Sequence, residues 1–267
     1  MTKQTIFALI LIFLIGCTSA TQKPEHSMED MQHMSMHAGA ENSLEVMNDV
    51  TITFERPSAE TGRETPLKFV FTKEGKPMDD LQIMHDKLMH VVLVRNGLKH
   101  FDHIHPKQTA PGVFVVPYTF AAAGEYRIWA DFTFDNMQHI IDFDIKVTGA
   151  PDAEEPDKLR GIQVKMSKPE SIVAGAKTQI AFAITDADGK EVPITEKFLA
   201  ADGHMIVIDE TLDEFEHAHD ETGDRDNTLS FSYTPEKPGK RMALVQFTVD
   251  GKDRTAEFEF SVGNAHE

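Results

Sequence analysis

The sequence predicts an all-β protein with two tandem antiparallel β-sandwich domains. Three observations lead there: short apolar runs alternate with polar residues, turn signals separate these runs, and the second half of the chain repeats the pattern of the first. The chain has 267 residues, of which 40% are hydrophobic. This length and apolar content are enough for two ordinary cores.

The first domain is expected to span residues 44–149. Its predicted strands are 44–54, 67–72, 89–94, 112–120, 126–134 and 139–147. Polar turns such as 73–76 and 95–97 separate several of them, a spacing typical of an Ig-like or cupredoxin-like sandwich. The run 89–94 is apolar on both faces, so we expect it near the centre of its sheet.

The second domain, predicted at 162–264, follows a linker at 150–161 that is rich in proline and acidic residues. Its predicted strands are 162–167, 178–185, 204–209, 228–234, 241–249 and 256–262. Asp131-Phe132-Thr133 in the first half matches Gln246-Phe247-Thr248 in the second. The two units therefore look like copies of one duplicated domain.

Both halves carry histidines in the form H-x12-H-x-H. The first set is His90, His103 and His105, and the second is His204, His217 and His219. Two histidines two positions apart on a strand point to the same face, and one from a paired strand can join them. Three imidazoles suit copper or zinc. A hydrogen-bond network within each hairpin is the alternative that needs no metal.

Further donors lie close to the first set. Met84 and His85 precede its strand and are expected to fold over it as additional ligands. The second set has carboxylates around it instead, which suits Cu(II) or zinc; these are Glu210, Glu214, Glu216 and Asp220. His100, His139 and His266, taken singly, are expected to be packing or surface residues.

Residues 1–16 are predicted to be a signal peptide. Lys3 gives a basic start, an apolar run follows, and Leu14-Ile15-Gly16-Cys17 resembles a bacterial lipobox. The signal would make Cys17 the lipidated first residue of the mature chain, and an ordinary secretory signal is the alternative. Residues 17–43 are then a disordered tether, because they lack the apolar residues for a core.

This tether contains a cluster of histidine and methionine. Its candidate copper ligands are His26, Met28, Met31, His33, Met34, Met36 and His37. Thioether sulfur favours Cu(I), whereas imidazole accepts both oxidation states of copper, so the mixture can hold either. A compositionally biased linker without a role is the alternative.

The leader, the tether and the strand-borne histidines together resemble bacterial secreted copper-binding β-sandwich lipoproteins, the CopC-like and FixH/YtkA-like group. The resemblance covers both domains but depends on short motifs. It implies an extracytoplasmic, lipid-anchored protein for copper sequestration, resistance or delivery, with a copper transporter or cuproprotein as acceptor. A net charge of -18 argues against a nucleic acid partner.

Two other classes of function remain open. Three histidines with a free fourth position suit a zinc or copper enzyme, either a hydrolase or a protein similar to superoxide dismutase. A surface adhesion or assembly module without metal is the second. The sequence has no nucleophile elbow, phosphate-binding loop or dinucleotide fingerprint. It therefore favours a metal-binding protein over an enzyme.

Overall fold

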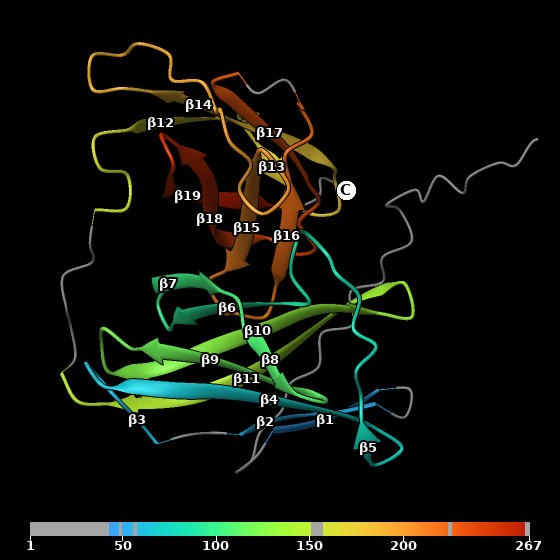
Figure 1. Ribbon diagram of the computed structural model, residues 1–267. Helices are drawn as coiled ribbons and strands as arrows, with labels where there is room; N and C mark the ends of the chain where they lie inside the picture. The colour runs from blue at the N-terminus through green and yellow to red at the C-terminus, as the bar shows by residue number, and fades with distance from the viewer. Residues whose placement is uncertain (1–42, 48–49, 56–57, 151–156, 224–225, 265–267) are drawn as a thin grey trace, which may run out of the picture. The chain divides into compact units, whose positions relative to one another are not determined.

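The computed structural model describes residues 43–264 apart from 48–49, 56–57, 151–156 and 224–225, with side chains from Val50 onward. These described residues belong to one compact unit. Its described part consists of two β-sandwiches, one formed by residues up to 150 and the other from 157 onward (Figure 1). The predicted signal, the lipidation site at Cys17 and the histidine and methionine donors of the tether lie outside the described residues.

The first sandwich has two sheets. One sheet has the order β1-β2-β4-β9-β8, with β5 paired to β4: β1 (Ser43–Met47), β2 (Val50–Glu55), β4 (Glu64–Lys73), β5 (Lys76–Pro77), β8 (Lys107–Ala110) and β9 (Val113–Thr119). The other has the order β3-β11-β10-β6-β7: β3 (Ala59–Glu60), β6 (Met89–Arg95), β7 (Lys99–Ile104), β10 (Gly124–Phe134) and β11 (Met137–Thr148).

The second sandwich repeats this plan with fewer strands. Its smaller sheet has the order β12-β14-β17: β12 (Gln163–Ser167), β14 (Thr178–Thr185) and β17 (Thr228–Tyr233). Its larger sheet has the order β13-β19-β18-β15-β16: β13 (Ile172–Val173), β15 (Gly203–Asp209), β16 (Phe215–His219), β18 (Gly239–Val249) and β19 (Lys252–Gly263). The five-stranded sheets of the two sandwiches thus share one topology.

The prediction of an all-β tandem fold is confirmed, with two differences in detail. The run 44–54 is not one strand but the hairpin β1–β2, and the turn-favouring pair Asn48-Asp49 stands between its arms in the sequence. Pairing is not wholly antiparallel, since the two-residue strands β3 and β13 lie parallel to β11 and β19. No helix among the described residues is long and apolar enough to cross a membrane.

Strand β6 shows why its sequence is apolar on both faces. Met89, Val91 and Leu93 enter the core of the first sandwich. Val92 and Val94, on the opposite face, join a separate apolar cluster that includes residues of the second sandwich. β6 lies between β10 and β7, one strand from the edge of its sheet, so its second face is covered by the neighbouring sandwich.

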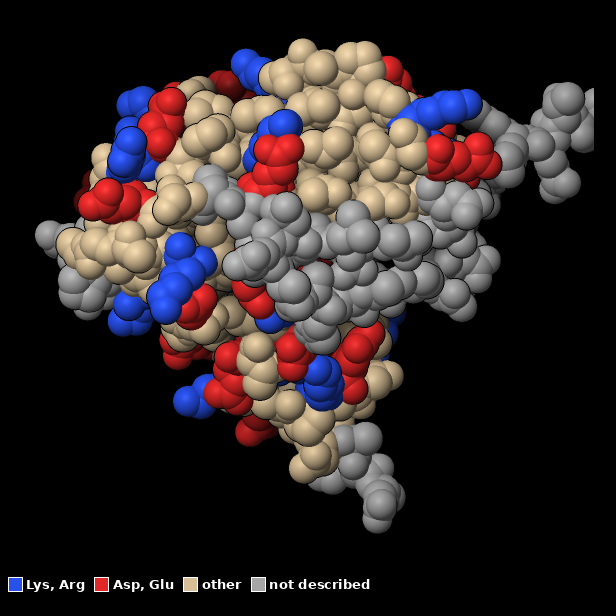
Figure 2. All heavy atoms as spheres, turned by 90° about the horizontal axis from the view of Figure 1, so that it is seen from below, with Lys and Arg blue, Asp and Glu red and all other residues tan. Residues whose placement is uncertain are grey.

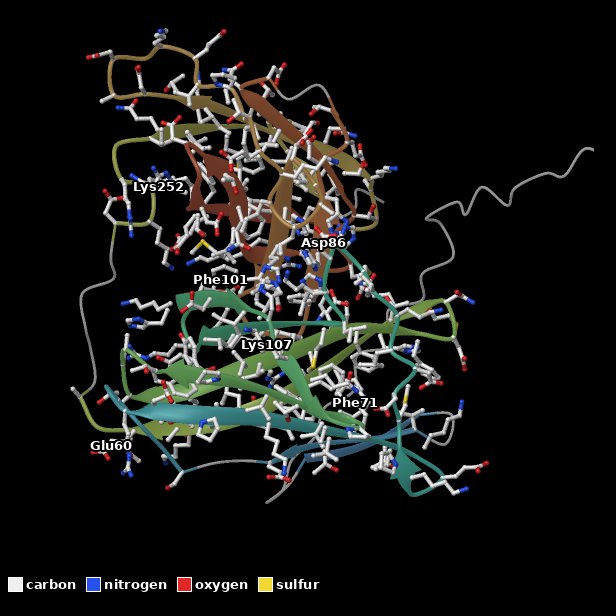
Figure 3. All side chains as sticks on the ribbon, viewed as in Figure 1. Glu60, Phe71, Asp86, Phe101, Lys107 and Lys252 are labelled. Atoms are coloured by element: carbon white, nitrogen blue, oxygen red, sulfur yellow. The ribbon has the colours of Figure 1, made fainter. Side chains whose placement is uncertain are left out.

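This shared apolar cluster joins the two five-stranded sheets. Trp129 of β10 stacks on Phe215 of β16, with ring centroids 5.1 Å apart and planes at 21°. Phe101 belongs to the same cluster, and Figure 3 shows it at the junction of the two sandwiches. Arg127 adds a hydrogen bond from its guanidinium to the carbonyl of Leu212 across the junction. The histidines of both halves lie on the same two faces.

Candidate metal centre

One β-hairpin in each sandwich presents three histidines. We call His90, His103 and His105 the first triad, and His204, His217 and His219 the second triad. In β6–β7, Val92 lies opposite His103, and β15–β16 has the same register, with His204 opposite His219. Residues directly opposite in an antiparallel ladder project to the same face. The fold therefore brings together the three histidines that the sequence pattern selected.

The spacing of the rings suits one ion per triad. Ring centroids in the first triad are 5.2, 5.0 and 4.7 Å apart, and in the second triad 5.1, 4.6 and 4.9 Å. Imidazoles bound to one tetrahedral ion through nitrogens at about 2.05 Å have centroids about 5 Å apart. The triads also meet each other, because the rings of His103 and His217 are 5.3 Å apart.

Burial keeps these imidazoles neutral. The pKa of His103 and that of His217 are held well below the usual value, first by loss of hydration and then by neighbouring histidines. The same burial lowers the pKa of His105 and of His204 to about 3, and it lowers those of His90 and His219. A neutral imidazole has one N–H and one nitrogen lone pair, so the partner of one nitrogen fixes the role of the other.

In the second triad, these partners leave two lone pairs facing each other. His217 donates from Nδ1 to a carboxylate oxygen of Asp131, 3.0 Å away on β10 of the first sandwich. His204 donates from Nε2 to the carbonyl of Leu199 at 3.3 Å. The remaining nitrogens, His204 Nδ1 and His217 Nε2, lie 2.8 Å apart. Two lone pairs at this distance repel unless a cation lies between them.

The first triad repeats the arrangement. His103 Nδ1 lies 2.8 Å from Oε1 of Gln246 on β18, and His90 Nε2 lies 3.0 Å from the carbonyl of Met84. His90 Nδ1 and His103 Nε2 then face each other at 3.1 Å. A side-chain amide can turn over and donate, whereas a carboxylate can only accept, so the lone-pair assignment is firmest at the second triad.

The third histidine of each triad also lacks a partner for one nitrogen. Nε2 of His105 and Nε2 of His219 are buried and have no hydrogen-bond partner among the described residues. Buried polar atoms are nearly always paired, and an unpaired one can mark the place of an ion. A carboxylate or carbonyl that accepts the second N–H is also the usual support of a metal-bound histidine. With both features, the histidine clusters could hold a metal ion.

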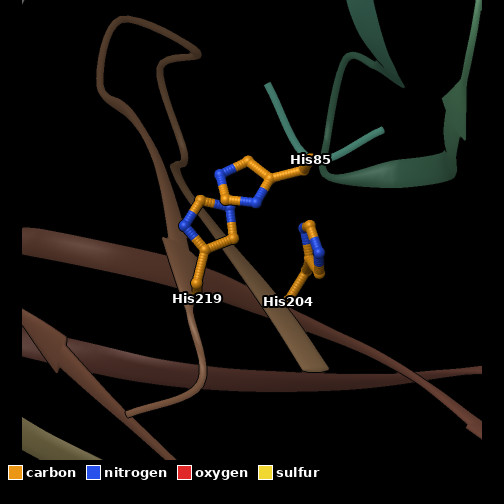
Figure 4. Close-up of side chains that lie close together, drawn as sticks. All are labelled: His85, His204 and His219. Atoms are coloured by element: carbon orange, nitrogen blue, oxygen red, sulfur yellow. The ribbon is translucent and has the colours of Figure 1, made fainter. Parts of the chain in front are cut away.

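The predicted additional ligands lie elsewhere. The Met84 sulfur lies 3.4 Å from the hydroxyl of Thr133, and the backbone of Met84, not its side chain, contacts the first triad. His85 reaches the second triad instead: its ring stacks on that of His219 at 3.6 Å, and its nitrogen lies within 4.8 Å of nitrogens of His204 and His219 (Figure 4). The β5–β6 loop that carries His85 rises from the first sandwich beside β16 (Figure 1), and Asp86 marks this loop in Figure 3.

The predicted carboxylate surroundings of the second triad are engaged in other contacts. Glu214 accepts hydrogen bonds from Arg241 and Tyr233, and Asp220 accepts from the backbone of Ser230 and the hydroxyl of Thr222. At strand ends and turns, carboxylates accept hydrogen bonds from backbone N–H and guanidinium groups that would otherwise lack an acceptor. The carboxylate that does reach the triad, Asp131, comes from the other sandwich.

The two remaining acidic positions and two single histidines are also placed. Glu210 accepts a hydrogen bond from the backbone of Lys240, and burial raises the pKa of Glu216 to about 7. His139 stacks on Phe132 and Phe134, and His100 is buried beside the β6–β7 turn. His266 lies outside the described residues.

A cavity of about 400 Å³ opens beside the first triad. Its lining includes His103, His105, Leu199, Gln246 and Lys158. The cavity lies between residues of both sandwiches and is bordered by basic and acidic side chains. On the face of the molecule shown in Figure 2, acidic and basic side chains are likewise intermingled.

Asp131 and Gln246 contact the triads, and the sequence pattern does not single them out as site residues. The two residues occupy equivalent positions of the repeat. The available signal is one strongly polar residue, besides the arginine near the start, inside each of the mostly apolar runs 126–134 and 241–249: Asp131 and Gln246. Both side chains are buried, at 1% and 7% exposure, and such groups need a defined partner.

A family model described as "Domain of unknown function (DUF8832)" matches residues 45–149 and again 157–264. The two matches cover most of the sequence, so the chain belongs to this family, with one copy in each sandwich. No curated protein matches the sequence.

Among solved structures, one similar chain is a Salmonella alpha-2-macroglobulin, at 13% identity over 84% of this chain and 15% of that chain, with a TM-score of 0.28. An Escherichia coli alpha-2-macroglobulin gives 12% identity over 81% and 20%, with a TM-score of 0.29. A DUF4785 family protein from Legionella pneumophila gives 8% identity over 80% and 55%, with a TM-score of 0.29. This chain spans less than a quarter of the macroglobulins, and the likenesses are too weak to assign an activity.

Proposed function

We propose that this protein binds one copper ion at each histidine triad and serves copper sequestration, resistance or delivery in the cell envelope. The observation that carries the proposal is the pair of facing lone pairs on His204 and His217, with the partnerless Nε2 of His219 beside them. A bound cation turns this repulsion into coordination. Three neutral imidazoles supply the ligands.

Copper suits this set better than the other divalent metals. Nitrogen sites bind Cu(II) more tightly than zinc by the general order of divalent metal affinities, and imidazole also accepts Cu(I). The tether sequence supplies His and Met donors from His26 to His37, which suit copper in both states. Zinc remains the competitor, because tetrahedral imidazole sites bind it well.

The cell-envelope location is part of the same proposal. It is supported by the apolar leader and by the lipobox-like sequence ending at Cys17. A lipid at Cys17 would tether the sandwiches to a membrane surface, where the tether captures copper and the triads hold it for a transporter or cuproprotein. A relation to the CopC-like and FixH/YtkA-like group would fit this role.

The proposal is tested by loading the purified chain with equimolar copper and zinc and measuring retained metal by elemental analysis. The chain used should carry serine at the seven tether donors, so that only the triads contribute. We expect about two copper ions per chain, by the triad count. Replacing the first triad by alanine should remove one ion, and replacing the second triad should remove the other. Retention of no metal tighter than micromolar would contradict the proposal.

A metal-dependent hydrolase is the second candidate, and one observation favours it. The cavity beside the first triad leaves room for water and a small substrate at a three-histidine site, the arrangement of catalytic zinc centres. Ester hydrolysis by the zinc-loaded chain, abolished by His105→Ala, would support this candidate. Absence of turnover with tight copper retention would favour the binding protein.

A further inference from the structure

The two triads are covered by equivalent turns of the opposite sandwich. Residues 84–87 form a turn closed by a bridge between Met84 and Lys87, and residues 198–201 form another closed by Phe198 and Ala201. Both turns have positive φ at their two central residues, 47° and 64° in the first and 50° and 65° in the second. This conformation costs most non-glycine residues about 1 kcal/mol or more. Its occurrence in both copies indicates that the turns have a positioning role.

The first of the two central residues differs in chemistry between the turns. In the first turn it is His85, which stacks on His219 of the second triad. In the second turn it is Leu199, which lines the cavity beside His103 and His105 of the first triad. Each sandwich therefore supplies the turn that lies over the triad of the other. Only the turn over the second triad carries a side chain that can bind a metal.

We infer that His85 is the fourth imidazole ligand of the second triad, so that the second site is closed whereas the first is open. The inference rests on the proposed function and says how its two sites differ. Structural metal sites have a full set of protein ligands, whereas exchanging or catalytic sites keep one position for solvent or substrate. The second site would then retain its ion, and the first would exchange it.

The position of His85 supports this role. Its ring centroid lies 5.5 Å from that of His204, close to the spacing of about 5 Å between imidazoles on one ion. Its 3.6 Å stack on His219 is closer than co-ligands allow, so its ring must turn out of the stack as the ion enters. The side chain is only half-buried and sits on a turn, which leaves room for this rotation.

The hydrogen-bond partners of the triads reinforce the difference. Asp131 supports His217 with a carboxylate, and Gln246 supports His103 with an amide oxygen. A negative partner makes the imidazole a stronger donor to the metal. Closure by His85 and support by Asp131 both favour tighter binding at the second site, whereas Leu199 and the adjacent cavity leave the first site accessible.

Reciprocal substitutions in the two turns, His85→Leu and Leu199→His, test the inference. In the full chain with serine at the tether donors, Cu(II) is loaded at both sites and its removal by excess EDTA is followed by absorbance and electron paramagnetic resonance. With both turns unmodified, one population of Cu(II) should leave quickly and another slowly. The slowly leaving Cu(II) should show four nitrogen ligands. His85→Leu should make the slow population leave about tenfold faster or more, with a three-nitrogen signal. Leu199→His should slow the fast population.

Controls keep the two proposals separate. His103→Ala should remove the fast population only, and His217→Ala the slow one only, which assigns each rate to its triad. Circular dichroism melting of the metal-free variants tests that both turns still fold. If no copper is retained with both covers intact, the proposed function fails. If two ions bind and His85→Leu leaves the slow rate and its nitrogen count unchanged, only the inference about His85 is overturned.

Discussion

The two triads are built by the same hairpin in the same register, yet they differ in everything that the opposite sandwich brings to them. The second triad receives a carboxylate from Asp131 and an imidazole from His85. The first receives the amide of Gln246 and the side chain of Leu199. Duplicated histidine hairpins can thus come to differ without a change in their own histidines, because the residues that contact those histidines belong to the other copy.

This comparison depends on the apolar junction that holds the sandwiches together. The largest expected effect follows from Trp129→Ala, because Trp129 is 1% exposed and stacks on Phe215 across the junction. We expect a loss of about 3–5 kcal/mol in the free energy of unfolding. Both triads should also lose about tenfold in copper affinity, since each relies on support from the opposite sandwich.

Urea unfolding and copper competition with a chelator measure these two changes. Phe182→Ala, which removes an aromatic ring from the second sandwich's own core, is the matched control. It should cost similar stability but leave the affinity of both triads in the folded protein nearly unchanged. Equal copper affinity in Trp129→Ala and the unmodified chain would show that the triads do not need the junction.

The next largest effect is expected from exchanging the hydrogen-bond partners Asp131 and Gln246, which should change the copper affinity of one triad and not of the other. Asp131→Asn keeps the size of the side chain but removes the charge, so we expect about 10–100-fold weaker copper binding at the second triad alone. Gln246→Glu should strengthen binding at the first triad, because a carboxylate then accepts from His103. Chelator competition with each single-triad variant measures both changes, and equal responses of the two triads to Asp131→Asn would contradict the assignment.

The smallest effect is expected at Met84. Its sulfur contacts the Thr133 hydroxyl, and its backbone carbonyl, which supports His90, survives any side-chain change. Met84→Leu should therefore change stability by less than about 1.5 kcal/mol and leave copper affinity nearly the same. Titration with Cu(I) is the sharpest measurement, since thioether sulfur prefers this state. A tenfold loss of Cu(I) affinity would show that the Met84 sulfur is a ligand after all.

The sequence by itself determined the β architecture, the repeat and the six triad histidines. Period-two alternation shows which residues share a strand face, and the two histidines of an H-x-H pair on a strand must project to the same face. It also marked β6 as buried on both faces, although the cover on its second face is a whole neighbouring sandwich. These features are local or are set by short hairpins, so composition and spacing were enough.

Only the tertiary structure decided which residues support and cover each triad. Asp131, Gln246, His85 and Leu199 are each more than forty residues from the triad they serve, and no periodicity along the chain reports a contact between two sandwiches. The sequence placed His85 over the nearer triad because its loop adjoins that hairpin. Packing of the two apolar faces carries it to the other triad, since burying Val92, Trp129 and Phe215 together fixes how the sandwiches meet.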